Sequence, residues 1–135
     1  MLTIKKHAAI DIGSNAVRLL IASIIEQKGQ PVKFKKTSLV RVPIRLGSDV
    51  FLNGEISEEN KNRMLDTMTA FKLLMKSHKV VTYKACATSA MREADNGVEL
   101  SKLISQKANI DIDIIGGEEE AAIIAATDLH SYIKE

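Results

Sequence analysis

The feature that most constrains the fold of this chain is a pair of apolar runs that flank one short polar segment. The first run is His7-Ala8-Ala9-Ile10, the second extends from Val17 to Ile25, and the segment between them is Asp11-Ile12-Gly13-Ser14-Asn15. Runs rich in Ile, Val and Leu are typical of strands, whereas Gly, Ser, Asn and Asp are typical of turns. The pattern predicts a hairpin whose tip carries a carboxylate, a hydroxyl and an amide.

The polar tip at residues 11–15 has two interpretations. A carboxylate, a glycine, a hydroxyl and an amide at the end of two strands form a compact place to hold a phosphate group or its metal ion. The same residue types are also the ordinary turn formers, and from these five positions alone a plain turn is favoured. The other motifs of the chain are needed to choose between a phosphate site and a plain turn.

Three strands are predicted in the first third of the chain, over residues 6–13, 15–27 and 32–42, with a turn at residues 28–31. Within the second run, residues 19–22 are apolar at every position. A strand that is apolar on both of its sides is expected where both faces of the sheet are covered. The sequence therefore predicts a sheet with helices on both faces.

The rest of the chain alternates between helical and strand-like patterns. Residues 43–54 are predicted to be a loop, and Ser57 is predicted to cap a long helix in which Met64, Leu65, Met68, Phe71, Leu74 and Met75 recur at helical spacing. Helices between strands imply crossover connections and therefore parallel pairing. The further elements expected are strand 80–87, helix 89–94, helix 98–107, strand 110–115 and a helix from about residue 118 onward.

The composition is that of a single folded domain spanning residues 1–135, with 45% hydrophobic and 27% charged residues. A net charge of +2 is too small to make DNA or an anionic membrane the expected partner. Cys86, the single cysteine, excludes an internal disulfide, fits a reducing compartment and is expected to be buried. No apolar run reaches the roughly 18 residues of a membrane span, so a cytoplasmic protein is expected.

A second segment with chemical potential follows the predicted strand 80–87. Thr88 and Ser89 bring hydroxyl groups to the start of a helix, where an anion could be held, and Arg92 could offer a planar fork to phosphate oxygens. The alternative is that Ser89 only caps the helix and that Arg92 forms a surface ion pair. Both interpretations are open for this segment alone.

A third segment follows the predicted strand 110–115 and contains Glu118-Glu119-Glu120. Three successive carboxylates repel one another, which can raise the pKa of the least solvated one. A carboxylate tuned in this way suits a general base that activates water. The alternative is a charged helix N-terminus, which must describe at least two of the three glutamates.

The order of elements resembles the ribonuclease-H-like lobe of the actin, sugar-kinase and Hsp70 superfamily. The motifs more specifically resemble the exopolyphosphatase and guanosine pentaphosphate phosphohydrolase (Ppx/GppA) family, from about His7 to Ile124. The motifs that carry this resemblance are Asp11-Ile12-Gly13-Ser14-Asn15 with Arg18-Leu19, Arg45-Leu46-Gly47, Ala87-Thr88-Ser89-Ala90 with Arg92-Glu93-Ala94 and Asn96-Gly97, and Gly117-Glu118-Glu119-Glu120-Ala121.

The resemblance implies an α/β lobe of actin-like, ribonuclease-H-like type, with a mixed five-stranded sheet and helices on both faces. It implies hydrolysis of terminal phosphoanhydride bonds in polyphosphate or guanosine pentaphosphate, with Mg²⁺ as cofactor. By position, Glu120 matches the catalytic residue that activates water, and Asp11 and Glu120 are candidate metal ligands. The residues expected around the phosphates are Gly13, Ser14, Asn15, Thr88 and Arg92.

Family members continue into a second lobe and bind substrate in the cleft between lobes, so the resemblance makes this chain an N-terminal lobe that is inactive by itself. The partners expected are polyphosphate or guanosine pentaphosphate, the second lobe and a possible homodimer, with neither DNA nor membrane. Two alternatives remain, namely a module that binds alarmone or polyphosphate without catalysis and an ATP-dependent kinase lobe of the same superfamily. The alanine-threonine-serine-alanine and glutamate-rich segments are not those expected of the kinases.

Overall fold

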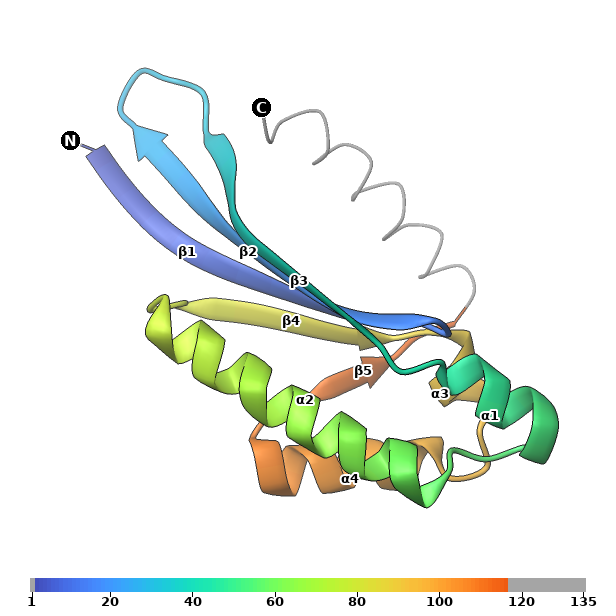
Figure 1. Ribbon diagram of the computed structural model, residues 1–135. Coiled ribbons are helices and arrows are strands. Elements are labelled where there is room, and N and C mark those ends of the chain that lie inside the picture. The colour runs from blue at the N-terminus through green and yellow to red at the C-terminus, as the bar shows by residue number, and fades with distance from the viewer. Residues whose placement is uncertain (1, 117–135) are drawn as a thin grey trace.

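The computed structural model describes residues 2–116, which form one mixed five-stranded sheet with four helices (Figure 1). The sheet order is β3-β2-β1-β4-β5. The first three strands are antiparallel, whereas β4 pairs in parallel with β1 and β5 pairs in parallel with β4, as the element order predicts. The strands are β1 (Leu2–Ile12), β2 (Ala16–Gln27), β3 (Lys33–Pro43), β4 (Thr82–Ala87) and β5 (Ile112–Ile114).

The two long helices, α2 (Glu58–Ser77) and α4 (Gly97–Ala108), lie side by side on one face of the sheet (Figure 1). The short helices α1 (Leu46–Asn53) and α3 (Ser89–Glu93) contact each other near the ends of β1 and β4. Within residues 2–116 the second face carries no helix, so its predicted cover stays a prediction. The helix predicted from residue 118 lies outside the described residues. No helix in the described part is long and apolar enough to cross a membrane.

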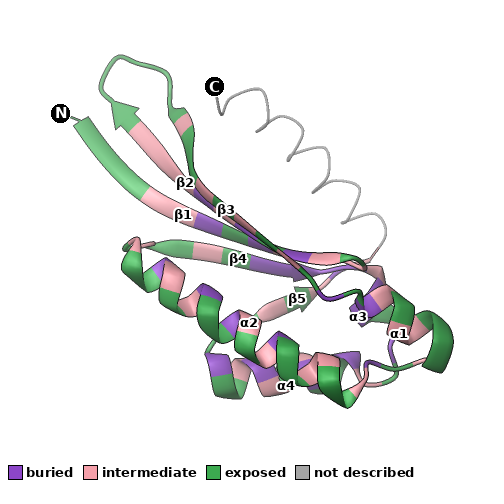
Figure 2. Ribbon diagram, in the orientation of Figure 1, coloured by how far each residue is buried: buried purple, intermediate pink, exposed green. Residues whose placement is uncertain are grey.

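Alternate residues of the central strands build the core beneath α2 and α4. Ala8, Ile10 and Ile12 of β1 are buried, and Val17 and Leu19 of β2 lie beside Ile12 and Ile10 in register. Side chains two residues apart share a face of a strand, so this set defines the helix-covered side. Figure 2 shows that the buried positions concentrate where β1, β2 and β4 run over the helices, whereas the outer ends of β1 to β3 are exposed.

Helix α2 forms as the sequence predicts. The Ser57 hydroxyl accepts a hydrogen bond of 3.2 Å from the Asn60 N–H, which satisfies one of the free amides at the helix start. Met64, Met68 and Phe71 are buried along one side of the helix. The methionines are therefore part of the core, as their spacing indicates.

The prediction of a loop over residues 43–54 is wrong, because residues 46–53 form helix α1. Its start is fixed by Arg45, whose left-handed backbone (φ 61°) turns the chain so that Leu46 becomes fully buried. Its end is fixed by Gly54, whose positive φ of 74° is the usual geometry after a helix. Asn53-Gly54 is therefore a helix stop, not evidence against a helix.

Candidate functional site

The candidate site lies where β1 and the parallel strand β4 end at the same edge of the sheet (Figure 1). Ile12 and Ala87 are register partners at this edge, so the segments that follow them leave side by side. The hydroxyl oxygens of Ser14 and Ser89 lie 3.0 Å apart and share a hydrogen bond. The first two predicted phosphate segments are therefore in contact, although 75 residues separate these serines.

The hairpin tip is both a tight turn and a supported loop. The Gly13 N–H donates to the Ala16 carbonyl at 3.0 Å and closes the turn between β1 and β2. The carbonyl of Asn15 accepts from the N–H groups of Ile44 at 3.2 Å and Arg45 at 2.9 Å. The plain-turn interpretation is thus correct for the backbone of the tip, and the chain before α1 holds the tip in place.

Gly47 allows α1 to approach the tip closely. Its N–H donates to the Ser14 carbonyl at 2.9 Å, and a Cβ atom at this position would lie 2.9 Å from the Ser14 Cβ. That separation is shorter than real carbon contacts allow, so a larger residue at position 47 must displace Ser14. The sequence motif that contains Gly47 therefore has a structural role in positioning the loop.

Thr88, rather than Ser89, occupies the N-cap position of α3, and its side chain makes no capping hydrogen bond. The Thr88 N–H donates to the Ile12 carbonyl at 3.1 Å, and the residue is buried. The alternative that Ser89 is only a helix cap is therefore wrong, because the Ser89 hydroxyl contacts Ser14. Thr88 joins the two strand ends, and Ser89 joins the two loops.

Arg92 connects the second segment to the third. Its Nη1 donates to the carbonyl oxygen of Ile115 at 2.7 Å, and the Ile115 N–H donates to the Ala87 carbonyl at 2.9 Å. The chain that leads to the predicted glutamates therefore starts beside β4 and α3. Glu120 and its neighbours Glu118 and Glu119 lie outside the described residues, so the structure does not describe the predicted general base.

Asp11 lies on the face of the sheet opposite to the buried residues Ile10 and Ile12, and it forms an ion pair with Arg18. The Arg18 Nη2 and Asp11 Oδ2 atoms are 2.7 Å apart, and both side chains are about half exposed, at 54% and 42%. Among the described residues no group of three or more His, Cys, Asp or Glu side chains could hold a metal ion. Mg²⁺ bound together with substrate phosphates needs only one or two protein carboxylates, and Asp11 fits that smaller role.

Two further side chains hold the helices around the site, and the sequence reasoning assigned neither of them a role. Asn96 forms a pair of hydrogen bonds of 2.9 Å with the backbone N–H and carbonyl of Ile56. The Asp49 Oδ2 atom accepts from the Ser57 N–H and hydroxyl and from the Asn60 amide at 2.8 to 3.0 Å. Burial tends to raise the pKa of Asp49, but these hydrogen bonds outweigh it and lower the pKa below its usual value.

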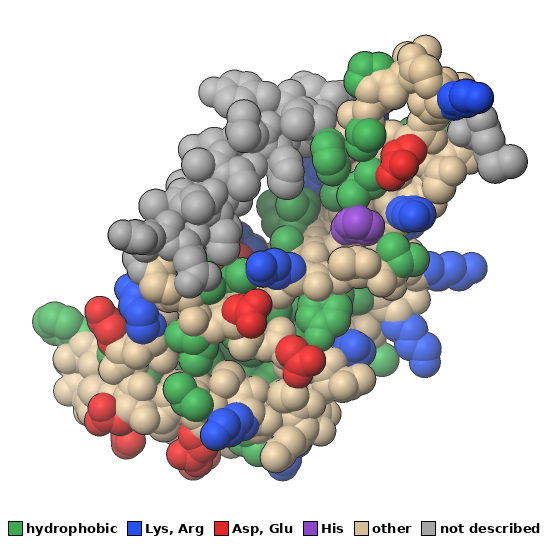
Figure 3. All heavy atoms as spheres, turned by 180° about the vertical axis from the view of Figure 1, so that it is seen from behind, with side chains coloured by type: hydrophobic (Ala, Val, Ile, Leu, Met, Phe, Trp, Pro, Cys, Tyr) green, Lys and Arg blue, Asp and Glu red, His purple; other side chains and the backbone are tan. Residues whose placement is uncertain are grey.

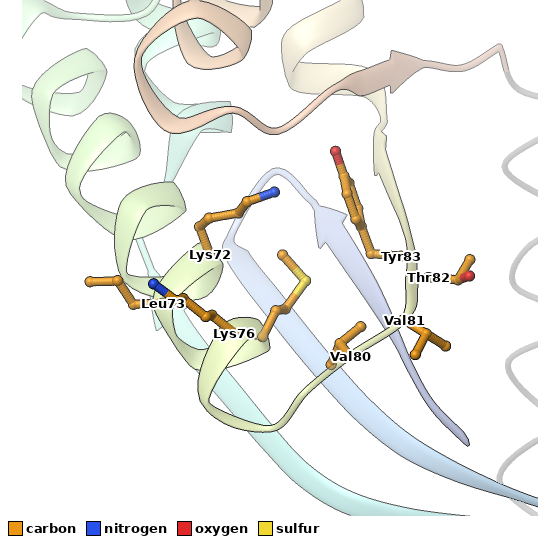
Figure 4. Close-up of a pocket in the computed structure, with 8 residues that line it drawn as sticks. Lys72, Leu73, Lys76, Val80, Val81, Thr82 and Tyr83 are labelled. Atoms are coloured by element: carbon orange, nitrogen blue, oxygen red, sulfur yellow. The ribbon is translucent and has the colours of Figure 1, made fainter. Parts of the chain in front are cut away.

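A hollow of about 400 Å³ lies between the end of α2 and the start of β4, at the other end of β4 from Ser14 and Ser89 (Figure 4). Lys72 lies over the ring of Tyr83 at 5.3 Å and donates to the Asn109 carbonyl at 3.1 Å, so its ammonium is occupied. The hollow is mostly lined by apolar side chains such as Val80 and Val81. It is separate from the candidate phosphate site.

Basic and acidic side chains are interspersed on the face that Figure 3 shows. No single block of positive charge covers this face. A mixed surface agrees with the net charge of +2 over the whole chain. A phosphate-containing ligand therefore has to be held by particular residues rather than by the overall field of the protein.

The family model described as "Ppx/GppA phosphatase family" matches residues 20–135, which is most of the chain. This chain belongs to the Ppx/GppA family. The crystal structure of the Ppx/GppA family member from Aquifex aeolicus superposes with a TM-score of 0.79 at 30% identity, over 87% of this chain and 37% of that one. The predicted actin-like, ribonuclease-H-like fold is thereby confirmed for this Ppx/GppA chain.

Two curated relatives represent the two activities in the Ppx/GppA family name. Exopolyphosphatase 1 of Mycobacterium bovis is 25% identical over 84% of this chain and 32% of its own length. Guanosine-5'-triphosphate,3'-diphosphate pyrophosphatase of Vibrio atlanticus is 28% identical over 87% of this chain and 23% of its own length. The chain thus spans about a quarter to a third of the length of these relatives.

Proposed function

We propose that this chain is the N-terminal lobe of a phosphohydrolase that releases the terminal phosphate of polyphosphate or guanosine pentaphosphate. Membership of the Ppx/GppA family supports the reaction class, since relatives carry the names of both activities. The second lobe of such an enzyme would close the site from the opposite side. The isolated lobe is expected to be inactive, because phosphoryl transfer depends on groups arranged all around the transferred phosphate.

The observation that carries this proposal is the contact between Ser14 and Ser89, whose hydroxyl oxygens are 3.0 Å apart. Two loops that are far apart in sequence supply hydroxyl groups to one point at the edge of the sheet. Ligands of open α/β sheets gather at this kind of edge, beyond the carboxyl ends of the strands. Two hydroxyls that now bond to each other can each turn to a phosphate oxygen when substrate enters.

The other site residues have complementary roles. Gly13 and Asn15 keep the tip compact so that phosphate can approach its backbone, and Thr88 fixes the second loop against β1. Arg92 would turn part of its guanidinium to phosphate, as a charged fork. Glu120 would take a proton from water as the water attacks the terminal phosphorus, and the shortened polyphosphate or guanosine tetraphosphate would leave.

Magnesium is part of the proposal, with Asp11 and Glu120 as candidate ligands. When bound with substrate, the ion would neutralise charge that develops on the phosphate oxygens. Asp11 can contribute one carboxylate if its ion pair with Arg18 opens or is shared. In a titration with Mg²⁺, the gain in tripolyphosphate affinity that the ion produces should be smaller for Asp11→Asn than for the parent chain.

The test is phosphate release from polyphosphate and guanosine pentaphosphate, measured for the chain joined to a second lobe and for the chain alone. Glu120→Gln in the two-lobed protein should lower kcat by at least about 100-fold, the usual scale for a general base. The free energy of unfolding and the substrate affinity of this variant should stay close to those of the parent protein. Undiminished turnover by Glu120→Gln would exclude this residue as the base.

A second candidate function is binding of polyphosphate or a guanosine alarmone without hydrolysis. The described part of the site favours it in one respect, because hydroxyls, backbone amides and Arg92 bind anions without requiring a base. Binding is common to both functions and cannot separate them. Phosphate release by the two-lobed protein separates them directly.

A further inference from the structure

We propose that Arg41 and Arg45 form an accessory anion site, which binds phosphate groups of an extended polyphosphate beyond the terminal one. This inference rests on the proposed function and assigns its substrate class as long inorganic polyphosphate in preference to a guanosine nucleotide. The two residues are called here the arginine strip. The strip adjoins the hairpin tip, so one ligand can contact both.

The burial pattern places both arginines on the solvent side of the segment that leads from β3 into α1. Ile44 and Leu46 are buried and Val42 packs against the core, whereas Arg41 and Arg45 are exposed. The Arg45 N–H is fixed 2.9 Å from the Asn15 carbonyl. One end of the arginine strip is therefore held directly at the candidate phosphate loop.

The other end of the strip adjoins the ion pair of Asp11. Arg41 is the register partner of Arg18 across β2 and β3, and Arg18 is the register partner of Asp11 across β1 and β2. The single carboxylate in this row is only 2.7 Å from Arg18. Arg41 therefore lies directly across from Arg18, whose guanidinium pairs with that carboxylate, and like charges directly across neighbouring strands destabilise a sheet.

Arg41 and Arg45 have no side-chain partner in the part of the chain that the structure describes, since neither takes part in an ion pair or side-chain hydrogen bond there. Asp49, the nearest acidic residue along the chain after Arg45, is occupied by Ser57 and Asn60. The positive charge of the strip is therefore uncompensated by these carboxylates. A bound anion would compensate it.

The geometry favours a chain of phosphates over a nucleotide. A ligand that contacts the end of β1 and also Arg41 on β3 has to cross two strand spacings, roughly 10 Å. Arginine binds phosphate oxygens through a planar fork, and each phosphate along a polyphosphate offers such oxygens.

The experiment titrates the 135-residue chain with long-chain polyphosphate and with tripolyphosphate at several salt concentrations. The variants are Arg41→Ala, Arg45→Gly and the double variant, with Lys35→Ala on the same strand as the charge-matched control. Glycine at position 45 removes the guanidinium and relaxes the positive φ, so this variant should be at least as resistant to urea as the parent. A structural role for Arg45 would instead lower that resistance.

The double variant should bind long polyphosphate at least 10-fold more weakly, and the slope of log affinity against log salt should fall by about 1.4 for two lost charges. Tripolyphosphate binding and the control should stay within about twofold of the parent. Unchanged affinity of the double variant for long polyphosphate would overturn the proposal that the arginine strip binds this ligand. Equal losses with single-stranded DNA would overturn its assignment to polyphosphate.

A last arm separates the strip from the proposed function. If tripolyphosphate binds the parent chain and Ser14→Ala weakens it, the phosphate loop is present whatever the strip does. If tripolyphosphate fails to bind while long polyphosphate binds through Arg41 and Arg45, the strip is supported and the proposed phosphate loop fails. The two proposals therefore fail by different measurements.

Discussion

The Ser14 and Ser89 hydroxyl oxygens lie 3.0 Å apart and join the turn after β1 to the start of α3. The contact is possible because β1 and β4 run in parallel and end together at Ile12 and Ala87. The hydrogen bond fixes the two loops against each other, so both hydroxyl groups are already at the same point of the sheet edge. Under the proposed function, a site ordered in this way would lose less entropy on binding phosphate.

We expect Ser14→Ala and Ser89→Ala each to weaken tripolyphosphate binding by about 3- to 10-fold, the cost of one or two hydrogen bonds. In a double-mutant cycle the two losses should be less than additive, because each substitution already breaks the shared bond. Calorimetric titration measures both effects. Ser23→Ala is the matched control, since Ser23 makes a similar bond to Thr37 at 3.2 Å. Fully additive losses would show that the two hydroxyls act independently.

The antiparallel pairing of the first strands and the parallel pairing of the later ones could be predicted from the sequence because burial imposes a simple pattern on it, whereas the sheet order β3-β2-β1-β4-β5 came from the structure. Apolar residues recur at the spacing of two in β1 and at helical spacing in α2, and the structure buries them accordingly. The tip at Gly13 was recognisable because turn residues interrupt two apolar runs. These signals are local, so one sequence is enough to see them.

Helix α1 and the supports of the site could not be predicted because they depend on contacts between distant segments. Arg45 adopts a left-handed backbone that local propensity disfavours, and the burial of Leu46 stabilises it. Asn96 has no periodic signature, yet it bonds to Ile56, 40 residues away. The sequence places Ser14 and Ser89 only in two segments that each follow a predicted strand. The bond between them required the structure.

Gly47→Ala is expected to damage phosphate binding more than it damages stability. The added Cβ would lie 2.9 Å from the Ser14 Cβ, so the loop must move by some tenths of an ångström. We expect a stability loss of about 1 to 3 kcal/mol, as for overpacking, and at least a 5-fold loss of tripolyphosphate affinity. Urea unfolding and titration measure the two. Gly116→Ala, where a Cβ meets nothing within 4 Å, is the control for stability.

Asn96→Ala should destabilise the chain by about 2 to 4 kcal/mol, because it leaves the partly buried N–H and carbonyl of Ile56 without their partners. The loss should appear as a lower urea midpoint with an unchanged slope. Asn62→Ala, at an exposed position of α2, is the matched control and should change stability by less than about 0.5 kcal/mol. A loss no larger than that of the control would show that Asn96 does not join these segments energetically.

The hydrogen bonds to Asp49 should make stability sensitive to acid. Its pKa is lower in the folded chain than its usual value, so the unfolded chain binds the proton more tightly and protonation favours unfolding. The contribution is therefore complete above the usual pKa of an aspartate, about 4, and is lost as the pH falls through the lower folded value. Asp49→Asn should flatten this part of a plot of unfolding free energy against pH and cost about 1 to 2 kcal/mol at neutral pH. Asp66→Asn, on the exposed side of α2, is the matched control. An equally steep acid dependence in Asp49→Asn would assign it to other carboxylates.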